Sequence, residues 1–280
     1  MSATTPFSSV NSPSSGSVAR ARTVLVTGAA KRIGRGVALE FARQGWDVAV
    51  HYGGSELDAR ETVADIEALG RRAVALQADL GVEAEVERLV PACMETFGGL
   101  NCVVNCASRF DEDTAIDFGY ARLLEMTAVN VAAPLTLARM LHAITPEAAA
   151  VDDAQRGVVI NVLDQKLYNM NPDYLSYTLT KAALDNATVA LAQALGPKLR
   201  VVGLAPGLTL ISAGQTPASF EAAHRVTPLN RASTVEDVAQ AACYLANAHG
   251  VNGTTLVVDG GQHLVPSPRD VMYMIGTQKP

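Results

Sequence analysis

Short runs of apolar and β-branched residues alternate along the chain with longer stretches whose apolar positions have helical spacing. The runs predict strands and the stretches between them predict amphipathic helices. The predicted strands are residues 23–27, 46–52, 73–78, 100–106, 157–163, 199–204 and 254–258. The predicted helices are residues 33–43, 55–69, 83–97, 120–144, 174–195 and 235–246. Ser55 and Asp58 have capping-box spacing at the start of the second helix.

Strands that alternate with helices predict a parallel sheet with helices on both faces. The fold class is therefore expected to be α/β: a single doubly wound Rossmann domain with a seven-stranded parallel sheet. No linker interrupts the middle of the chain, so this domain is expected to span residues 23–264. It lies between a Ser-rich tail at 1–22, expected to be disordered, and a C-terminal extension at 265–280. An organelle import signal is the alternative for the tail.

Composition narrows the class of protein. Of 280 residues, 49% are hydrophobic and 18% are charged, so the chain can bury a large core. The net charge of −6, without a long basic run, argues against nucleic-acid binding. The uncharged stretch 201–220 is interrupted by glycines and prolines, so no membrane span is expected. The four cysteines form no C-x-x-C pair, which favours reduced thiols in a cytoplasmic protein without a metal site.

A glycine-bearing turn links the first predicted strand to the first predicted helix. It reads Thr27-Gly28-Ala29-Ala30-Lys31-Arg32-Ile33-Gly34-Arg35-Gly36. Small residues let the backbone approach a pyrophosphate, and the N-terminus of a helix attracts the anion. The second strand ends at residues 51–55 without the acidic residue that binds a ribose hydroxyl of NAD. Together with Arg32, this favours NADP(H), although Lys31, Arg32 and Arg35 could instead be solvated surface charges.

Tyr177 and Lys181 are four residues apart at the start of the sixth predicted helix, so their side chains share one face. An ammonium group beside a phenol favours the phenolate. We therefore expect Lys181 to lower the pKa of Tyr177 and to make it a better proton donor. The spacing alone is common in helices. Its position after the fifth strand of a dinucleotide-binding fold is what indicates catalysis.

From Thr23 to about Leu264 the chain resembles the short-chain dehydrogenase/reductase family. The motifs that carry the resemblance are Thr27–Gly34, Ala78-Asp79-Leu80, Asn105-Cys106-Ala107, Asn130, Tyr177 with Lys181, Pro206-Gly207 and Asp259-Gly260-Gly261. The resemblance implies hydride transfer from a nicotinamide, with Tyr177 as the acid, Lys181 on the ribose and Asn130 on a proton-relay water. It implies cofactor contacts from Gly28, Arg32, Ile33, Gly34, His51, Tyr52, Ser55, Asp79, Leu80, Asn105, Ala107, Lys181, Pro206 and Gly207.

Two departures from the family pattern resemble one branch of it. Arg32 replaces the middle glycine of the turn, and Asp164 replaces the usual serine thirteen residues before the tyrosine. An ionised carboxylate cannot donate to a developing alkoxide, but it accepts from N–H groups and can help Tyr177 protonate a ring nitrogen. These departures resemble the pteridine reductases and their bacterial dihydromonapterin reductase relatives. That resemblance implies a pterin between Arg32, Ser108, Phe110, Asp164 and Tyr177, with Phe110 stacked on the ring.

Three functions are compatible with these residues. The leading hypothesis is NADPH-dependent reduction of a pterin-type C=N bond, in a dihydropterin such as dihydromonapterin or in dihydrofolate. The alternatives are an NADPH-dependent carbonyl reductase for a 3-oxoacyl thioester or another ketone, and a non-catalytic NADP-binding regulator. The family resemblance also implies a homotetramer. Leu264 to Pro280 extends past the last predicted strand, and we expect this segment to pack near a neighbouring subunit. Lys166 and residues 211–230 have no role that the sequence assigns.

Overall fold

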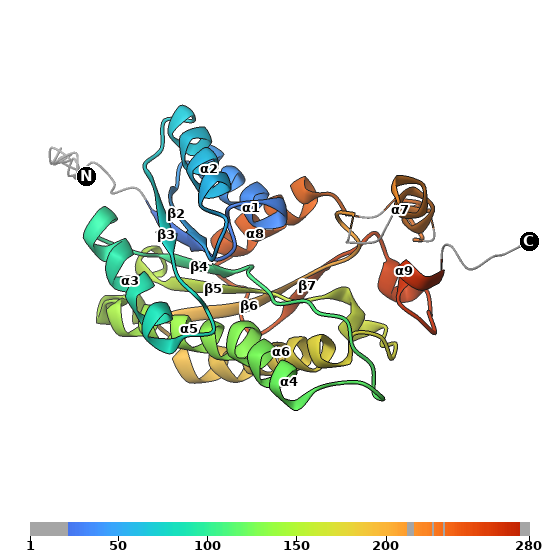
Figure 1. Cartoon of the computed structure of the whole chain (residues 1–280). Coiled ribbons are helices and arrows are strands. Elements are labelled where there is room, and N and C mark those ends of the chain that lie inside the picture. Colours follow the sequence, from blue (N-terminus) through green and yellow to red (C-terminus); the bar gives the residue numbers. More distant parts are fainter. Residues whose placement is uncertain (1–21, 212–215, 226, 232, 275–280) are drawn as a thin grey trace, which may run out of the picture.

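One seven-stranded sheet runs through the middle of the computed structural model and separates two layers of helices (Figure 1). The structure describes residues 22–211, 216–225, 227–231 and 233–274. The strands are β1 (Thr23–Val26), β2 (Asp47–Tyr52), β3 (Ala73–Gln77), β4 (Cys102–Asn105), β5 (Gly157–Val162), β6 (Leu199–Pro206) and β7 (Thr255–Val258). They pair in the order β3-β2-β1-β4-β5-β6-β7, and every pair is parallel. The expected doubly wound sheet is confirmed.

The helices divide between the two faces of the sheet, as Figure 1 shows. One face carries α1 (Arg32–Arg43), α2 (Glu56–Ala68) and α8 (Val235–Asn247). The other carries α3 (Glu83–Phe97), α4 (Tyr120–Thr127), α5 (Ala133–Ile144) and α6 (Leu175–Leu195). Two shorter helices, α7 (Pro217–His224) and α9 (Val271–Met274), contact each other to one side of the sheet. Short 3-10 turns are η2 (Glu147–Ala150), η3 (Asp153–Gln155), η4 (Gln165–Tyr168) and η5 (Gln262–Leu264).

Alternate side chains of the central strands enter two separate cores, because both faces of the sheet are covered. In β1, Val24 and Val26 pack in the core beneath α1 and α8, whereas Leu25 packs in the opposite core. In β4, Val104 packs in the core beneath α1 and α8, and Val103 packs in the opposite core. Both faces of these strands therefore need apolar residues. This is why the strands read in sequence as continuous apolar runs.

Three local features differ from the sequence-based expectation. The predicted helix at 120–144 contains a π-helical turn, η1 (Ala128–Ala132), between α4 and α5. Ser55 precedes α2, but its side chain makes no capping hydrogen bond, and Asp58 lies 3.6 Å from the ammonium of Lys31 instead. A reciprocal capping box forms at the start of α8, between Thr234 and Asp237. Helix α7 falls in a region where the sequence predicted no regular element.

Described residues on both sides of the expected domain, 23–264, contact it. Arg22 belongs to the fold, because its guanidinium lies 4.2 Å above the Trp46 ring and donates to Asn247. The rest of the tail, with its expected disorder and the alternative import signal, lies outside the described residues. At the other end, residues 265–274 fold back onto their own chain, where Asn169 donates to the carbonyl oxygen of Val265.

Two further observations concern the described residues as a group. Within the described ranges, no helix combines the length and the apolar character that crossing a membrane requires. In the same part of the chain, no three His, Cys, Asp or Glu side chains gather in a group that could hold a metal ion.

Candidate active site

The turn after β1 is fastened to the end of β4 by a threonine. The Thr27 hydroxyl accepts hydrogen bonds of 3.0 Å from the backbone N–H groups of Cys106 and Ala107. Gly28 has a φ of +66°, in the left-handed region that favours glycine, and a Cβ on it would lie 3.0 Å from the Cα of Ala107. A Cβ on Gly34 would lie 2.2 Å from the carbonyl oxygen of Gly28. The two expected glycines therefore allow a tight turn where the chain order of the sheet reverses, between β1 and β4.

His51 supports this turn from behind. Its Nδ1 accepts from the N–H of Gly28 at 3.0 Å, so its Nε2 carries the hydrogen and donates to the carbonyl oxygen of Ala78 at 3.1 Å. Burial lowers the pKa of this imidazole, which is therefore neutral at pH 7. Both ring nitrogens are used inside the protein. Any contribution of His51 to cofactor binding acts through the position of Gly28.

The N-terminus of α1 has the properties of an anion site. Its N-cap residue, Lys31, makes no side-chain capping hydrogen bond, and its first turn contains no acidic residue. Arg32 follows with a φ of +57°, and its guanidinium donates to the carbonyl oxygen of Ile211 at 3.2 Å. Among the described residues Arg32 has no carboxylate partner, whereas Arg35 pairs with Asp65. Arg32 can therefore bind an anion without breaking an ion pair.

Two of the residues expected to be catalytic, Tyr177 on α6 and Asp164 just after β5, are in direct contact. The Tyr177 hydroxyl donates to Oδ2 of Asp164 at 2.8 Å, and the Asp164 side chain also accepts from the N–H of Lys166. Burial, followed by the charge of Asp164 and the hydrogen bond to it, raises the pKa of Tyr177 well above its ordinary value. The expectation that Lys181 lowers this pKa is wrong for the protein alone, because burial and Asp164 outweigh the ammonium.

Lys181 lies one turn further along α6. Its Nζ donates to the carbonyl oxygen of Val162 at 2.7 Å and lies 5.7 Å from the centre of the Tyr177 ring. Burial lowers the pKa of Lys181 to about 8, while Asp164 and Cys106 act in the opposite direction. Lys181 is therefore largely a cation at pH 7. A further anion beside it would stabilise the charged form.

Asn130 lies in the π-helical turn and is fully hydrogen-bonded. Its Oδ1 accepts from the N–H of Arg109 and the hydroxyl of Ser108, and its Nδ2 donates to the Arg109 carbonyl and to Thr180. It thus joins the loop after β4 to α6. With the side chain engaged in this way, its expected role on a proton-relay water stays a prediction.

A cavity of about 1000 Å³ opens beyond the carboxyl ends of the strands, between these groups. The expected residues that line it are Arg32, Ile33, Ser108, Phe110, Asp164, Tyr177 and Gly207. The other expected site residues do not line it: Gly28, Gly34, His51, Tyr52, Ser55, Asp79, Leu80, Asn105, Ala107, Asn130, Lys181 and Pro206. Of these, Asp79 is exposed and accepts from the N–H of Gly81, while buried Asn105 donates to Asn161 on β5.

Phe110 forms an aromatic wall of the cavity. Its ring stacks on Tyr174 at 4.4 Å between centres with an interplanar angle of 20°, and it meets Tyr177 edge-on at 4.6 Å. It is still 45% exposed, so part of the ring is accessible to a flat ligand. Tyr174 was not among the expected residues, although its position three residues before Tyr177 could have indicated it. Lys166, Asp270 and Val271 also line the cavity.

This fold and this site define a short-chain dehydrogenase/reductase. A family model described as enoyl-(acyl carrier protein) reductase matches residues 28–263, and the chain belongs to this family of oxidoreductases. Among curated proteins, it is 33% identical to 3beta-hydroxysteroid dehydrogenase 1 from Eggerthella lenta, over 88% of this chain and 95% of that protein.

Solved structures extend the comparison. The FolM alternative dihydrofolate reductase 1 from Brucella canis, complexed with NADP, is 36% identical with a TM-score of 0.83, over 90% of this chain and 97% of that one. The Brucella suis protein of the same description, also in complex with NADP, is 36% identical with a TM-score of 0.82, over 89% and 98% of the two chains. The chain is thus similar to pteridine reductase-like members of the family.

Proposed function

We propose that this protein is an NADPH-dependent reductase of a pterin-type C=N bond, in a dihydropterin such as dihydromonapterin or in dihydrofolate. The observation that carries the proposal is the 2.8 Å hydrogen bond from the Tyr177 hydroxyl to the Asp164 carboxylate. A serine in place of Asp164 would be suited to a substrate ketone, because a hydroxyl donates to a developing alkoxide. A carboxylate is suited to a substrate with N–H donors, as an amino-substituted heterocycle has.

The residues around the turn fit NADP(H). The tight Gly28 and Gly34 backbone, the N-terminus of α1 and the side chain of Arg32 would hold phosphate groups. The end of β2, at Tyr52, carries no acidic residue to repel a 2′-phosphate. Lys181 would bind the ribose of the nicotinamide. Both Brucella structures similar to this chain are NADP complexes.

Reduction of a C=N bond adds a hydride to the carbon and a proton to the nitrogen. NADPH supplies the hydride when bound. The proton comes from the Tyr177 hydroxyl, which Asp164 orients by accepting its hydrogen bond. Asp164 would also accept from the amino or ring N–H groups of the substrate, and Phe110 would stack on its flat ring. The cationic Lys181 stabilises the phenolate that remains on Tyr177 after the proton leaves.

A carbonyl reductase is the second candidate. The observation in its favour is the similarity to the steroid dehydrogenase from Eggerthella lenta, whose name describes chemistry at a hydroxyl carbon. A non-catalytic regulator has less support, because Asp164 and Tyr177 are hydrogen-bonded at the wall of the cavity and the Lys181 ammonium lies 5.7 Å from the centre of the Tyr177 ring.

Stopped-flow measurement of NADPH absorbance tests the proposal. With dihydromonapterin or dihydrofolate we expect consumption of one NADPH per substrate molecule, and slower consumption with a panel of 3-oxoacyl thioesters and ketones. No turnover of either pterin, together with fast turnover of a ketone, would replace the proposal by its second candidate.

Assembly and location are parts of the same proposal. We propose a homotetramer, as the family resemblance implies, and a cytoplasmic location, which the cysteine pattern favours. Sedimentation equilibrium at micromolar concentration measures the mass directly, and a stable monomer of 29.3 kDa would exclude the tetramer.

A further inference from the structure

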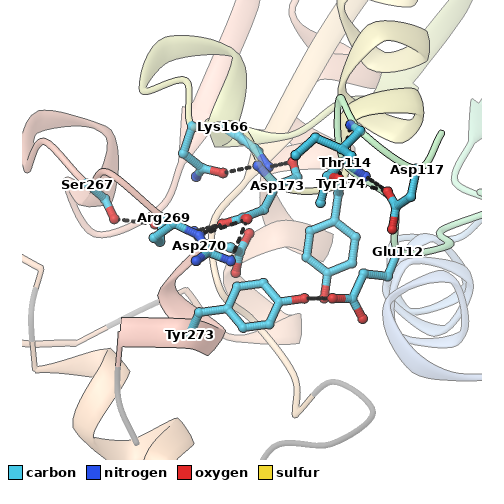
Figure 2. A network of polar contacts seen from close by, with 12 residues as sticks. Glu112, Thr114, Asp117, Lys166, Asp173, Tyr174, Ser267, Arg269, Asp270 and Tyr273 are labelled. Atoms are coloured by element: carbon cyan, nitrogen blue, oxygen red, sulfur yellow. Dashed lines mark hydrogen bonds and ion pairs between the residues drawn. The ribbon is translucent and has the colours of Figure 1, made fainter. Parts of the chain in front are cut away.

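The C-terminal segment 265–274, called here the strap, is bound to the loop before α6 by an ion pair (Figure 2). The Nε of Arg269 donates to both carboxylate oxygens of Asp173, at 2.8 and 2.9 Å, and its Nη2 lies 2.8 Å from Oδ1. The backbone N–H of Asp270 donates to the same carboxylate at 2.6 Å. Asp173 is only 4% exposed, so three donors from the strap hold a buried carboxylate.

Asp173 is connected in turn to the catalytic pair. Its carbonyl oxygen accepts a hydrogen bond from the Nζ of Lys166, a buried lysine in η4 whose pKa is lowered by burial. The backbone N–H of Lys166 donates to Asp164 at 2.8 Å, and Asp164 accepts from Tyr177. Lys166, which the sequence left without a role, thus connects the loop held by the strap to the carboxylate that orients the proton donor.

The strap also reaches the opposite wall of the cavity. Tyr273 donates to the carboxylate of Glu112, in the loop after β4, and lies 3.4 Å from the hydroxyl of Tyr174 (Figure 2). Tyr174 stacks on Phe110, the ring expected to face the substrate. Asp270 and Val271 themselves line the cavity. The strap therefore contacts both loops that carry the site and forms a wall between them.

We propose that Asp173 and Arg269 are positioning residues for substrate reduction. Their ion pair holds the strap across the cavity, and the strap keeps the Asp164–Tyr177 side and the Phe110 side at a fixed separation for a flat substrate. The assignment of the substrate as a pterin rests on the proposed function, whereas the closure by the strap rests on the contacts above. Arg269 acts through Asp173 and touches no reacting atom.

A double-mutant cycle tests the positioning role. Asp173→Asn and Arg269→Met should each raise the KM for dihydromonapterin roughly tenfold, with kcat changed less and the Kd of NADPH within about twofold. The double variant should match either single variant, because both remove one ion pair. Arg269→Lys should recover part of the affinity, since it keeps the charge but loses the bidentate geometry. The matched control is Arg139→Met, which removes an exposed ion pair with Glu87.

Values of KM within about twofold of the wild type in both single variants, or effects that multiply in the double variant, would overturn the positioning role. Hydrogen–deuterium exchange provides a readout without substrate. Asp173→Asn should speed exchange of peptides from the strap roughly tenfold and leave peptides from β1 and β4 unchanged. Equal exchange of the strap peptides in the wild type and in Asp173→Asn would overturn the proposal that the ion pair holds the strap across the cavity. Faster exchange in Asp173→Asn, together with no pterin turnover by the wild type, would support the role of the ion pair in holding the strap. It would also reject a pterin as the substrate.

Discussion

Tyr177 donates its phenolic hydrogen to Asp164, and this hydrogen bond joins α6 to the end of β5 within the cavity. The carboxylate holds the phenol protonated, because its charge and the burial of the ring both raise the pKa of Tyr177. In the proposed reaction, Tyr177 would therefore hold its proton until the substrate is bound. The Lys181 ammonium, on the next turn of the same helix, would stabilise the phenolate that Tyr177 becomes in that reaction.

Replacement of Asp164 tests this relationship. Asp164→Asn keeps the size of the side chain but removes its charge, so we expect kcat/KM for dihydromonapterin to fall roughly 100-fold. The pKa of Tyr177 should fall as well, because the carboxylate no longer favours the neutral phenol. Steady-state kinetics and the pH dependence of kcat measure the two effects.

Asp164→Ser separates the two candidate reactions. A serine at this position can donate to a developing alkoxide, so ketone reduction should appear as pterin reduction is lost. Binding of NADPH, followed by fluorescence titration, should be unchanged in both variants. A Ser variant that retains pterin reduction and gains no ketone reduction would contradict the role given to this carboxylate.

The pKa of Lys181 predicts the pH above which the activity falls. Its pKa is lowered to about 8 by burial, so the free enzyme carries this cation below pH 8 and loses it as the pH rises. We expect kcat/KM for NADPH to fall above about pH 8. The fall in kcat should occur at a higher pH than the fall in kcat/KM. The negative charges of bound NADPH raise the pKa of Lys181 in the complex.

Measurement of initial rates from pH 6 to 10 with saturating dihydropterin gives both profiles. Lys181→Arg provides the control, because a guanidinium stays charged throughout this range. Its kcat/KM for NADPH should be lower but independent of pH up to about 10. If kcat/KM for NADPH still falls near pH 8 in Lys181→Arg, the titrating group is not Lys181.

Much of the fold is readable from the sequence because its strands are buried on both faces and its helices are amphipathic. The π-helical turn at Asn130 is not readable in this way, because it is a single turn of five residues between two α-helices, too short to leave a periodic pattern of its own. Tyr177, Lys181 and Asp164 are also readable, since each follows a strand or opens a helix. Asp173 and Arg269 are not, because they are 96 residues apart and no motif joins them.

Arg32 predicts the preference for the phosphorylated cofactor. Its guanidinium has no carboxylate partner among the described residues and lies at the N-terminus of α1. Arg32→Met should lower the preference for NADPH over NADH about tenfold, because a charge-assisted bidentate contact to the 2′-phosphate is lost. Binding of NADH should change little.

The matched control for this variant is Arg35→Met. Arg35 lies in the first turn of the same helix but pairs with Asp65, so its loss should leave the preference unchanged. Isothermal titration with both nucleotides measures the ratio of affinities. An equal loss of NADH binding in Arg32→Met would indicate that Arg32 shapes the turn rather than contacting the phosphate.

Gly34 is the position where the turn tolerates the least change. A Cβ there would lie 2.2 Å from the carbonyl oxygen of Gly28, a backbone atom that cannot move without displacing the turn. Gly34→Ala should therefore lower the free energy of unfolding by about 2–3 kcal/mol, the usual cost of overpacking. The displaced N–H groups of the turn should also weaken NADPH binding by at least tenfold.

Gly250→Ala is the control, because a Cβ at Gly250 meets nothing within 4 Å. Both the free energy of unfolding and the affinity for NADPH should stay at the wild-type value. Urea denaturation and fluorescence titration of the two variants, side by side, decide whether close packing at Gly34 forms the phosphate site.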